Sequence, residues 1–261
     1  MIFRRIIYTA LLVGLLAGLV LSAAQFAAVN PIIFAAESYE AESHGADGVA
    51  TDHNHGSHDH GDAWAPENGI ERTLHTIFAN VAAGIGFAAI LLALMGQLQL
   101  SGITQLSTCK GILWGIAGFI AVFIAPAIGI SPELPGADAA AIEKRQLWWI
   151  LAVVLVAIGL LSLSFAPLKY KAIGLISLVI PYIVTIPTHQ GPAFTNPDPK
   201  AVEALSSLSQ QFIINSAASN LLFWITLGVL ASWGLNRWVL KNISGNNKVT
   251  ATKNSNLNAG A

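Results

Sequence analysis

The sequence is short of charged residues. Only 10% of its 261 residues are Asp, Glu, Lys or Arg, whereas 54% are apolar and the mean hydropathy is +0.61. Soluble domains carry about 25% charged residues, so a soluble monomer of this composition could not cover its surface with polar groups. The net charge of −1 also leaves no basic surface for nucleic-acid phosphates. These shortages argue against a soluble cytosolic enzyme and against a nucleic-acid binder.

Cysteine and the common catalytic motifs are also scarce. Cys109 is the single cysteine, so the chain can form neither an internal disulfide nor a cysteine-based zinc cluster. The sequence contains no P-loop, no His-Glu-x-x-His and no Gly-x-Ser-x-Gly motif, which are signatures of ATP hydrolysis and of two hydrolase classes. We therefore expect a protein that is not an enzyme and holds no tightly bound cofactor.

Long apolar runs dominate the remaining sequence. A helix needs about 20 apolar residues to cross a membrane, and the alternation typical of barrel strands is absent. The fold class predicted is all-α, a polytopic integral membrane helix bundle with six transmembrane helices, or five if the first is a cleaved signal. The fifth run has only 15 residues, contains Pro181 and reaches the required length only if it extends to Thr188. The six runs are 6–28, 74–98, 112–130, 147–165, 172–186 and 213–235.

The distribution of charge predicts the orientation. With six spans and a cytoplasmic N-terminus, nine Lys and Arg lie in inner segments and four in outer segments, as the positive-inside rule requires. All fourteen Asp and Glu fall on the outer side, and none of the six runs contains a charged residue. This last feature disfavours a proton-relay pump, which needs carboxylates within the membrane. We expect a multi-pass protein with both termini in the cytoplasm.

The chain divides into four predicted regions. The first is a transmembrane span that could be an anchor or a signal peptide, and its 23-residue run is longer than an ordinary signal core, which favours an anchor. The second is a His- and acid-rich outer loop, largely disordered because it has few apolar residues. The third is the transmembrane bundle and the fourth a disordered cytoplasmic tail. Their bounds are 1–34, 35–72, 73–238 and 239–261.

Two pairs of glycines have small-xxx-small spacing within the apolar runs. They are Gly14 with Gly18 and Gly111 with Gly115. Such spacing lets helix backbones approach closely. We therefore predict that these glycines serve helix packing.

The outer loop holds the most concentrated chemistry of the chain. Neutral imidazole and carboxylate groups are ligands for divalent transition metals, and Gly56 gives the segment freedom to fold around an ion. The pattern predicts metal capture outside the membrane, with Cu(II), Ni(II) and Zn(II) held more tightly than Co(II). A solvated or pH-responsive linker is the alternative, because histidine titrates near neutrality. The candidate ligands are His53, His55, His58, Asp59 and His60.

Three further candidate ligands lie at the ends of apolar runs. His75 is the second residue of the second run, Glu133 lies in the turn 131–136, and His189 lies in the turn 187–192. Both turns are flanked by proline, which lowers the entropy cost of ordering a ligand. On the predicted topology all three residues lie at the outer face and could share one polar mouth. The alternatives are an interfacial carboxylate for Glu133, an interfacial histidine bonded to backbone carbonyls for His189, and a helix-start histidine in the headgroup region for His75.

Several of these segments together resemble one family. The segment Glu71-Arg72-x-x-His75-Thr-x-x-Ala79-Asn80, the Ser-Pro-Glu-Leu-Pro-Gly turn and the Pro-Thr-His-Gln-Gly-Pro turn resemble CbtA. This resemblance covers roughly residues 1–235 and implies a predicted cobalt transporter subunit of the bacterial inner membrane. It also implies Co(II) as the transported ion and a small one-span partner of the CbtB type. The family is usually described with five spans, one fewer than counted here.

The sequence therefore predicts a membrane subunit of a divalent-metal transporter, with cobalt implied by the resemblance. The outer His/Asp loop would capture the metal and pass it to the polar mouth. Two alternatives are a redox protein with haem between His75 and His189 and an accessory protein that buffers metal. The expected partners are membrane lipid, a divalent metal ion and a CbtB-type subunit, and no nucleic acid.

Overall fold

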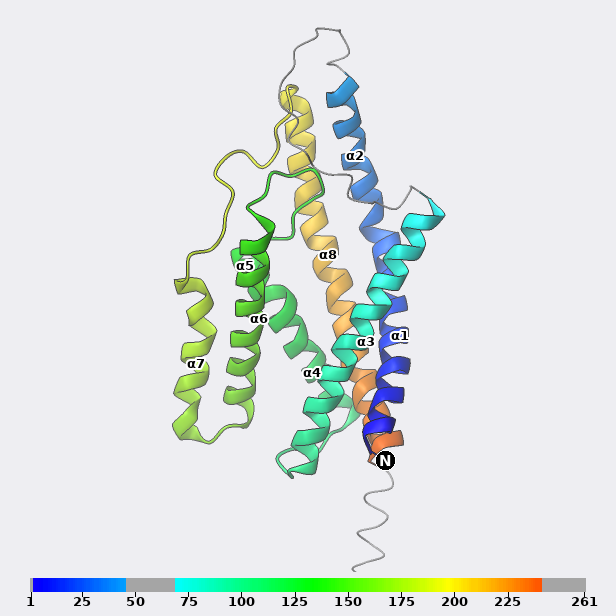
Figure 1. Ribbon diagram of the computed structural model, residues 1–261, viewed down its shortest axis with the longest axis vertical. Coiled ribbons are helices and arrows are strands. Elements are labelled where there is room, and N and C mark those ends of the chain that lie inside the picture. The colour runs from blue at the N-terminus through cyan, green and yellow to red at the C-terminus, as the bar shows by residue number, and fades with distance from the viewer. Residues whose placement is uncertain (1, 46–68, 241–261) are drawn as a thin grey trace, which may run out of the picture. The chain divides into compact units, whose positions relative to one another are not determined.

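The computed structural model describes residues 2–45 and 69–240, and every regular element within these ranges is helical (Figure 1). This confirms the all-α prediction. Two short stretches are π-helical, η1 within the third apolar run and η2 at the end of the last. The elements are α1 (Ile2–Ala28), α2 (Asn30–Gly45), α3 (Ile70–Leu100), α4 (Thr108–Phe119), η1 (Ile120–Ile124), α5 (Ala125–Gly129), α6 (Ile142–Phe165), α7 (Leu168–Ile183), α8 (Pro199–Gly234) and η2 (Leu235–Val239).

Five helical stretches of the described chain are long and apolar enough to cross a membrane. They are Phe3–Ala28, Ile70–Leu100, Thr108–Gly129, Ile142–Phe165 and Pro199–Val239. The remaining predicted span is helix α7, which has 16 residues. At about 1.5 Å per residue this helix is about 24 Å long, less than the roughly 30 Å of hydrocarbon. The fifth run is therefore helical as predicted, but too short to cross the membrane as a helix alone.

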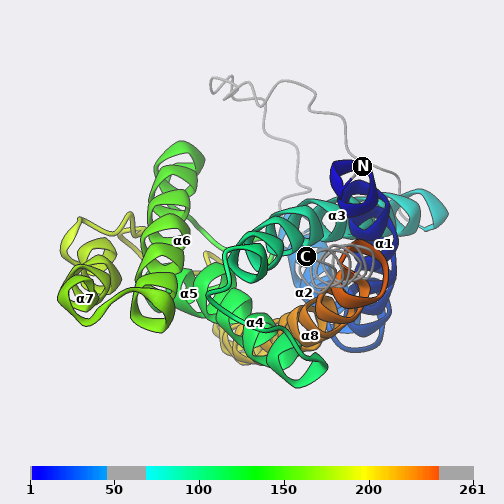
Figure 2. The same ribbon diagram turned by 90° about the horizontal axis from the view of Figure 1, so that it is seen from below.

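Helices α6 and α7 form an antiparallel pair (Figures 1 and 2). A Cβ added to Gly159 of α6 would lie 2.6 Å from the Leu178 side chain of α7, so the two helices are in close contact. The Trp148 indole, in the second turn of α6, donates a hydrogen bond of 3.2 Å to the carbonyl of Pro181 near the end of α7. Helix α7 thus runs back alongside α6, and the chain continues past Ile183 without helical structure.

The described contacts divide the chain into two compact units. Unit 1 consists of Met1–Val20, Ala79–Gly118 and Leu221–Ala261, and unit 2 of Leu21–Phe78 and Phe119–Asn220. Helices α1, α3 and α8 each contribute residues to both units. Each unit has its own mode of packing.

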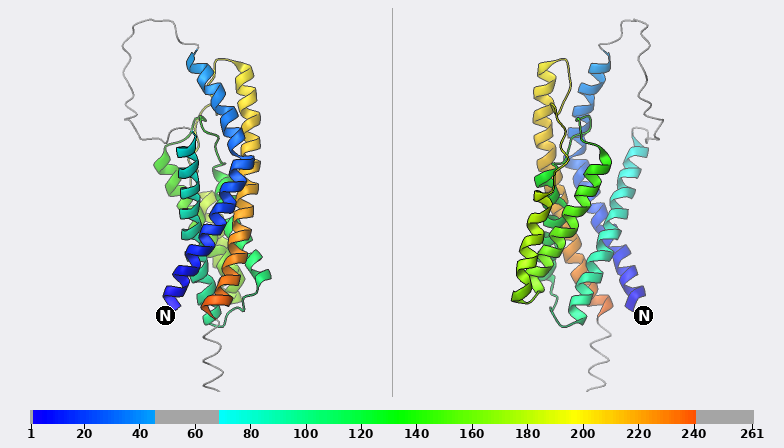
Figure 3. Two further views of the ribbon diagram at one scale, coloured as in Figure 1. Left: turned by 90° about the vertical axis from the view of Figure 1, so that its right-hand side faces the viewer. Right: turned by 60° about the vertical axis from the view of Figure 1, so that its left-hand side comes forward.

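Unit 1 is held by helices whose backbones touch. The course of α1, in blue, and of α3, in cyan, can be followed in Figure 3. A Cβ at Gly84 of α3 would lie 2.5 Å from the carbonyl oxygen of Gly14 of α1. A Cβ at Gly228 of α8 would lie 2.2 Å from the carbonyl oxygen of Gly111 of α4. Real Cβ atoms do not approach this closely, so only glycine permits these contacts. The packing predicted for both small-xxx-small pairs is confirmed.

Unit 2 contains an apolar cluster built largely from segments outside the predicted spans. Its members belong to α2, the turn after α5, the segment before α8 and the first turns of α8. The buried members are Ile32, Ala36, Leu134, Phe194 and Leu205. The amide of Asp138 donates a hydrogen bond of 2.9 Å to the carbonyl of Ala193, and the Thr195 hydroxyl donates one of 2.7 Å to the Asp138 carboxylate. The segments that directly follow the two proline-flanked turns are therefore joined.

The expectation of an irregular outer loop over 35–72 is wrong at both ends, because residues 35–45 belong to α2 and residues 70–72 belong to α3. Ile32 and Ala36 are four residues apart and both are buried in the cluster of unit 2, so tertiary packing stabilises a helix that is too polar to be recognised as a span. The rest of the predicted outer loop to residue 68, and the predicted tail from residue 241, lie outside the described residues.

Candidate functional site

The structure describes the residues of the predicted mouth but not those of the predicted capture loop. The loop ligands His53, His55, His58, Asp59 and His60 lie outside the described residues. The other three candidates are described, and all belong to unit 2. Within the described part of the chain, no three His, Cys, Asp or Glu side chains lie close enough to hold one metal ion. The structure therefore does not bring His75, Glu133 and His189 together as a ready three-ligand site.

Glu133 lies in the turn between α5 and α6, and this turn is firmly anchored. The next residue, Leu134, is only 1% exposed within the apolar cluster of unit 2. Gly136 has a φ of +83°, a left-handed conformation that glycine adopts without strain and that reverses the chain. The Glu133 carboxylate forms an ion pair with the guanidinium of Arg145 in the first turn of α6, and the two side chains are 32% and 28% exposed. The carboxylate is thus fixed in place and still reaches water.

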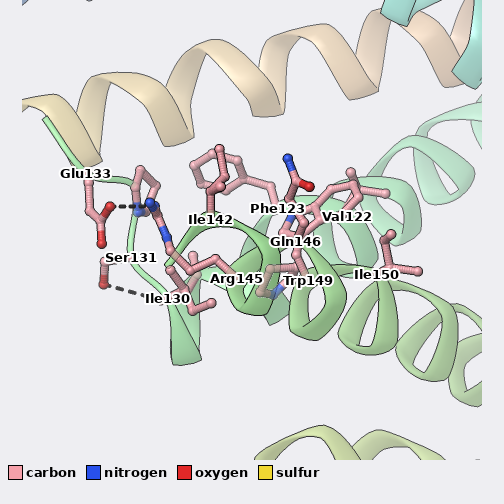
Figure 4. Close-up of a pocket in the computed structure, with 13 residues that line it drawn as sticks. Val122, Phe123, Ile130, Ser131, Glu133, Ile142, Arg145, Gln146, Trp149 and Ile150 are labelled. Carbon is pink, nitrogen blue, oxygen red and sulfur yellow. Dashed lines mark hydrogen bonds and ion pairs between the residues drawn. The ribbon is translucent and has the colours of Figure 1, made fainter. Parts of the chain in front are cut away.

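A pocket of about 540 Å³ lies beside this ion pair (Figure 4). Glu133 and Arg145 stand at one end of it, and the side chains of Phe123, Ile142 and Trp149 form part of an apolar wall. Phe123 belongs to η1, and single π-helical turns occur frequently at functional sites. The arrangement offers one accessible carboxylate at the end of a largely apolar cavity.

His75 lies near the start of α3 and is exposed. Its Nδ1 is 3.0 Å from the carbonyl oxygen of Glu71, one helical turn earlier. In a neutral ring this contact favours a proton on Nδ1, which leaves the lone pair on Nε2. His75 therefore lies near a helix start, the position that its predicted alternative assumes, and its Nδ1 contact to the backbone was not predicted.

His189 lies in the segment between α7 and α8 and is exposed. Its Nε2 is 2.8 Å from the position that a Cβ on Gly191 would take, so the ring folds back over this glycine. The same segment is hydrogen-bonded to the Glu133 turn through Asp138. His189 and Glu133 are therefore carried by joined segments, although no third ligand of these types completes a site with them.

Unit 2 contains a second ion pair between Arg72 of α3 and Glu37 of α2. Two guanidinium nitrogens of Arg72 donate to the two carboxylate oxygens, at 3.2 and 2.6 Å. The guanidinium also lies 5.3 Å from the centroid of the Phe34 ring. A bidentate contact combined with a cation–π contact is the strong form of such a pair. This pair connects α2 to the start of α3.

Sequence reasoning missed the partner of each carboxylate. Arg145 is one of the four Lys and Arg that the sequence places in outer segments, and its pairing with Glu133 was not predicted, although two spans joined by a short loop would bring these two residues close together. That proximity was the available signal. The Arg72–Glu37 pair had no such signal, because it depends on α2 continuing as a helix beyond the first apolar run.

Comparison with known proteins identifies a family. A family model described as CbtA, probable cobalt transporter subunit, matches residues 3–236. Neither a curated protein nor a solved structure matches the chain. The match covers nearly the whole chain and agrees with the resemblance found in the sequence motifs.

Proposed function

Because the chain belongs to the CbtA family of probable cobalt transporter subunits, we propose that it carries Co(II) or a similar divalent ion across the membrane. In this proposal the segment 52–62 gathers the ion and Glu133 receives it beside the pocket of unit 2. The family description favours transport over the haem and metal-buffering alternatives. Co(II) is substrate here, so the chain needs no resident metal.

The observation that carries this proposal is the anchored and accessible carboxylate of Glu133. A transported ion must be bound and then released, so a few ligands completed by water suit passage better than a closed cage. Carboxylate oxygen and imidazole nitrogen both bind borderline divalent ions. We assign His189 and His75 to separate contacts along the route, each exposed and each in unit 2, rather than to one shared cage.

We assign the outer face to the side that carries Glu133 and His189, with both termini in the cytoplasm. Two observations support this orientation. The segments that follow α5 and α7 are hydrogen-bonded to each other, so α6 and α7 together leave one face and return to it. The split of nine inner and four outer Lys and Arg then obeys the positive-inside rule. Reporter fusions after Lys248 and within 46–60 test this, and an outside C-terminus would contradict it.

We further propose that the first helix is retained in the mature protein of the bacterial inner membrane. Gly14 packs backbone to backbone against Gly84 of α3, and cleavage after the small residues at 22–28 would remove that contact. N-terminal sequencing of the purified protein tests retention. Uptake measured for the chain alone and together with a CbtB-type subunit tests whether it needs that partner.

Replacing the four loop histidines with serine separates capture from passage. In the proposal, segment 52–62 raises the ion concentration near Glu133. Without its histidines we expect the half-saturating Co(II) concentration to rise by about tenfold, with the maximal uptake rate nearly unchanged. The matched control is Asp47→Ser, which changes the predicted outer loop without removing an imidazole. Loss of the maximal rate in the histidine variant, with the protein still inserted, would contradict the division of labour.

A further inference from the structure

The two ion pairs of unit 2 are equally exposed but differently held. The side chains of Arg72 and Glu37 are 31% and 34% exposed, close to the 28% and 32% of Arg145 and Glu133. Arg72 makes two hydrogen bonds to its carboxylate and lies over an aromatic ring. Arg145 pairs with its carboxylate from Nη2 to Oε2 of Glu133. Its Nε is buried and has no hydrogen-bond partner in the described structure.

An unpaired buried donor makes the Arg145 position costly. A buried N–H without an acceptor loses its hydrogen bonds to water and gains none in exchange. A guanidinium that moves from this position into water recovers those bonds, and this recovery offsets part of the lost ion-pair attraction. Arg145 can therefore be released more easily than Arg72, which would lose a bidentate contact and a cation–π contact.

The two partners of this pair also differ in mobility. Glu133 is held between Pro132 and the buried Leu134, so its carboxylate stays in place when its partner leaves. Arg145 has a long side chain at the start of α6, and the adjoining pocket of about 540 Å³ is lined by both residues (Figure 4). The pocket gives an incoming hydrated ion or a departing guanidinium space beside the carboxylate.

We propose that Arg145 is a tethered competitor of the transported cation at Glu133. Its guanidinium occupies the carboxylate in the ion-free protein, and a divalent ion binds by displacing it. This rests on the proposed function, in which Glu133 is a metal contact. Exchange of a single positive charge for a double one strengthens the attraction to the carboxylate, whereas exchange for Na⁺ or K⁺ does not. Arg145 thus sets both the affinity and the preference for divalent over monovalent cations.

The direct test measures Co(II) binding to the purified full chain by calorimetry, with His53, His55, His58 and His60 replaced by Ala to silence the loop. Removal of the competitor in Arg145→Gln should tighten binding by about fivefold and increase inhibition by Na⁺. Arg145→Lys retains a tethered cation and should stay near the parent affinity. The matched control Arg72→Gln removes the other pair and should leave binding unchanged. Unchanged or weaker binding in Arg145→Gln would overturn the proposal.

A second measurement needs no Arg145 variant. Phenylglyoxal modifies exposed guanidinium groups, so Co(II) should speed the labelling of Arg145 in the chain without the four loop histidines. Mass spectrometry follows the labelling of each arginine, and Arg72 is the internal control. Co(II)-independent labelling of Arg145 would overturn the displacement. If instead Glu133→Gln leaves both Co(II) binding and cellular uptake intact, the proposed role of Glu133 fails and the competitor fails with it. If Glu133→Gln abolishes both while Arg145 behaves as an inert neighbour, only the competitor fails.

Discussion

Unit 1 and unit 2 are held by different sets of contacts. In unit 1 the backbones of α1 and α3, and those of α4 and α8, touch at glycines. In unit 2 the contacts include two ion pairs, a hydrogen-bonded pair of turns and an apolar cluster outside the predicted spans. The charges follow the same division. The ranges of unit 1 contain seven Lys and Arg and no acidic residue, whereas those of unit 2 contain all fourteen Asp and Glu.

This difference suggests different roles, with unit 1 as a structural scaffold and unit 2 as the unit that carries the chemical site. Where two backbones touch through glycine, the contact excludes side chains and ions alike. Where carboxylates lie on anchored turns beside a pocket, they can exchange partners. We therefore expect substitutions at the glycine contacts of unit 1 to change stability, and substitutions at Glu133 to change transport.

The largest effect on stability should come from Gly84→Ala. The new Cβ would lie 2.5 Å from the carbonyl oxygen of Gly14, and the helices must separate to admit it, at a cost of about 2–3 kcal/mol. Thermal unfolding in detergent measures this loss. The matched control is Gly86→Ala on the same helix, where nothing lies within 4 Å of the new Cβ. Equal stability of the two variants would contradict backbone contact as the basis of unit 1.

Leu134→Ala should have a slightly smaller effect, located in unit 2. The side chain is 1% exposed in the apolar cluster and anchors the turn of Glu133. Its removal leaves a cavity that costs about 2 kcal/mol and loosens the turn, so uptake should fall together with stability. Combined unfolding and uptake assays measure both quantities. Full uptake by a clearly destabilised variant would show that the anchored turn is not needed for transport.

Trp148→Phe should have the smallest effect on stability. It removes the indole donor to the Pro181 carbonyl and retains the aromatic packing, so we expect a loss of about 1 kcal/mol. Trp149→Phe is the matched control, because Trp149 is adjacent on α6 and is 38% exposed. Similar unfolding temperatures for both variants would show that this bond does not stabilise the α6–α7 pair.

The features predicted from sequence are those that depend on local pattern. Apolar length predicted the helical runs, and the spacing of Gly14 and Gly111 with their partners predicted close packing. The features that were missed depend on tertiary contact. Helix α2 is polar and is stabilised by burial of Ile32 and Ala36, and periodicity within one run does not reveal such a partner. The pairing of Glu133 with Arg145 likewise requires the geometry of the turn between α5 and α6.

The central claim, that Glu133 receives the transported ion, is tested most directly by Co(II) uptake at saturating metal. We compare Glu133→Gln with Glu37→Gln, since each variant breaks one Arg–Glu pair of unit 2 and only the first removes the proposed ligand. The account predicts that Glu133→Gln lowers the maximal rate at least about tenfold, corresponding to about 1.4 kcal/mol, while Glu37→Gln transports normally. Normal uptake by an inserted Glu133→Gln protein would contradict it.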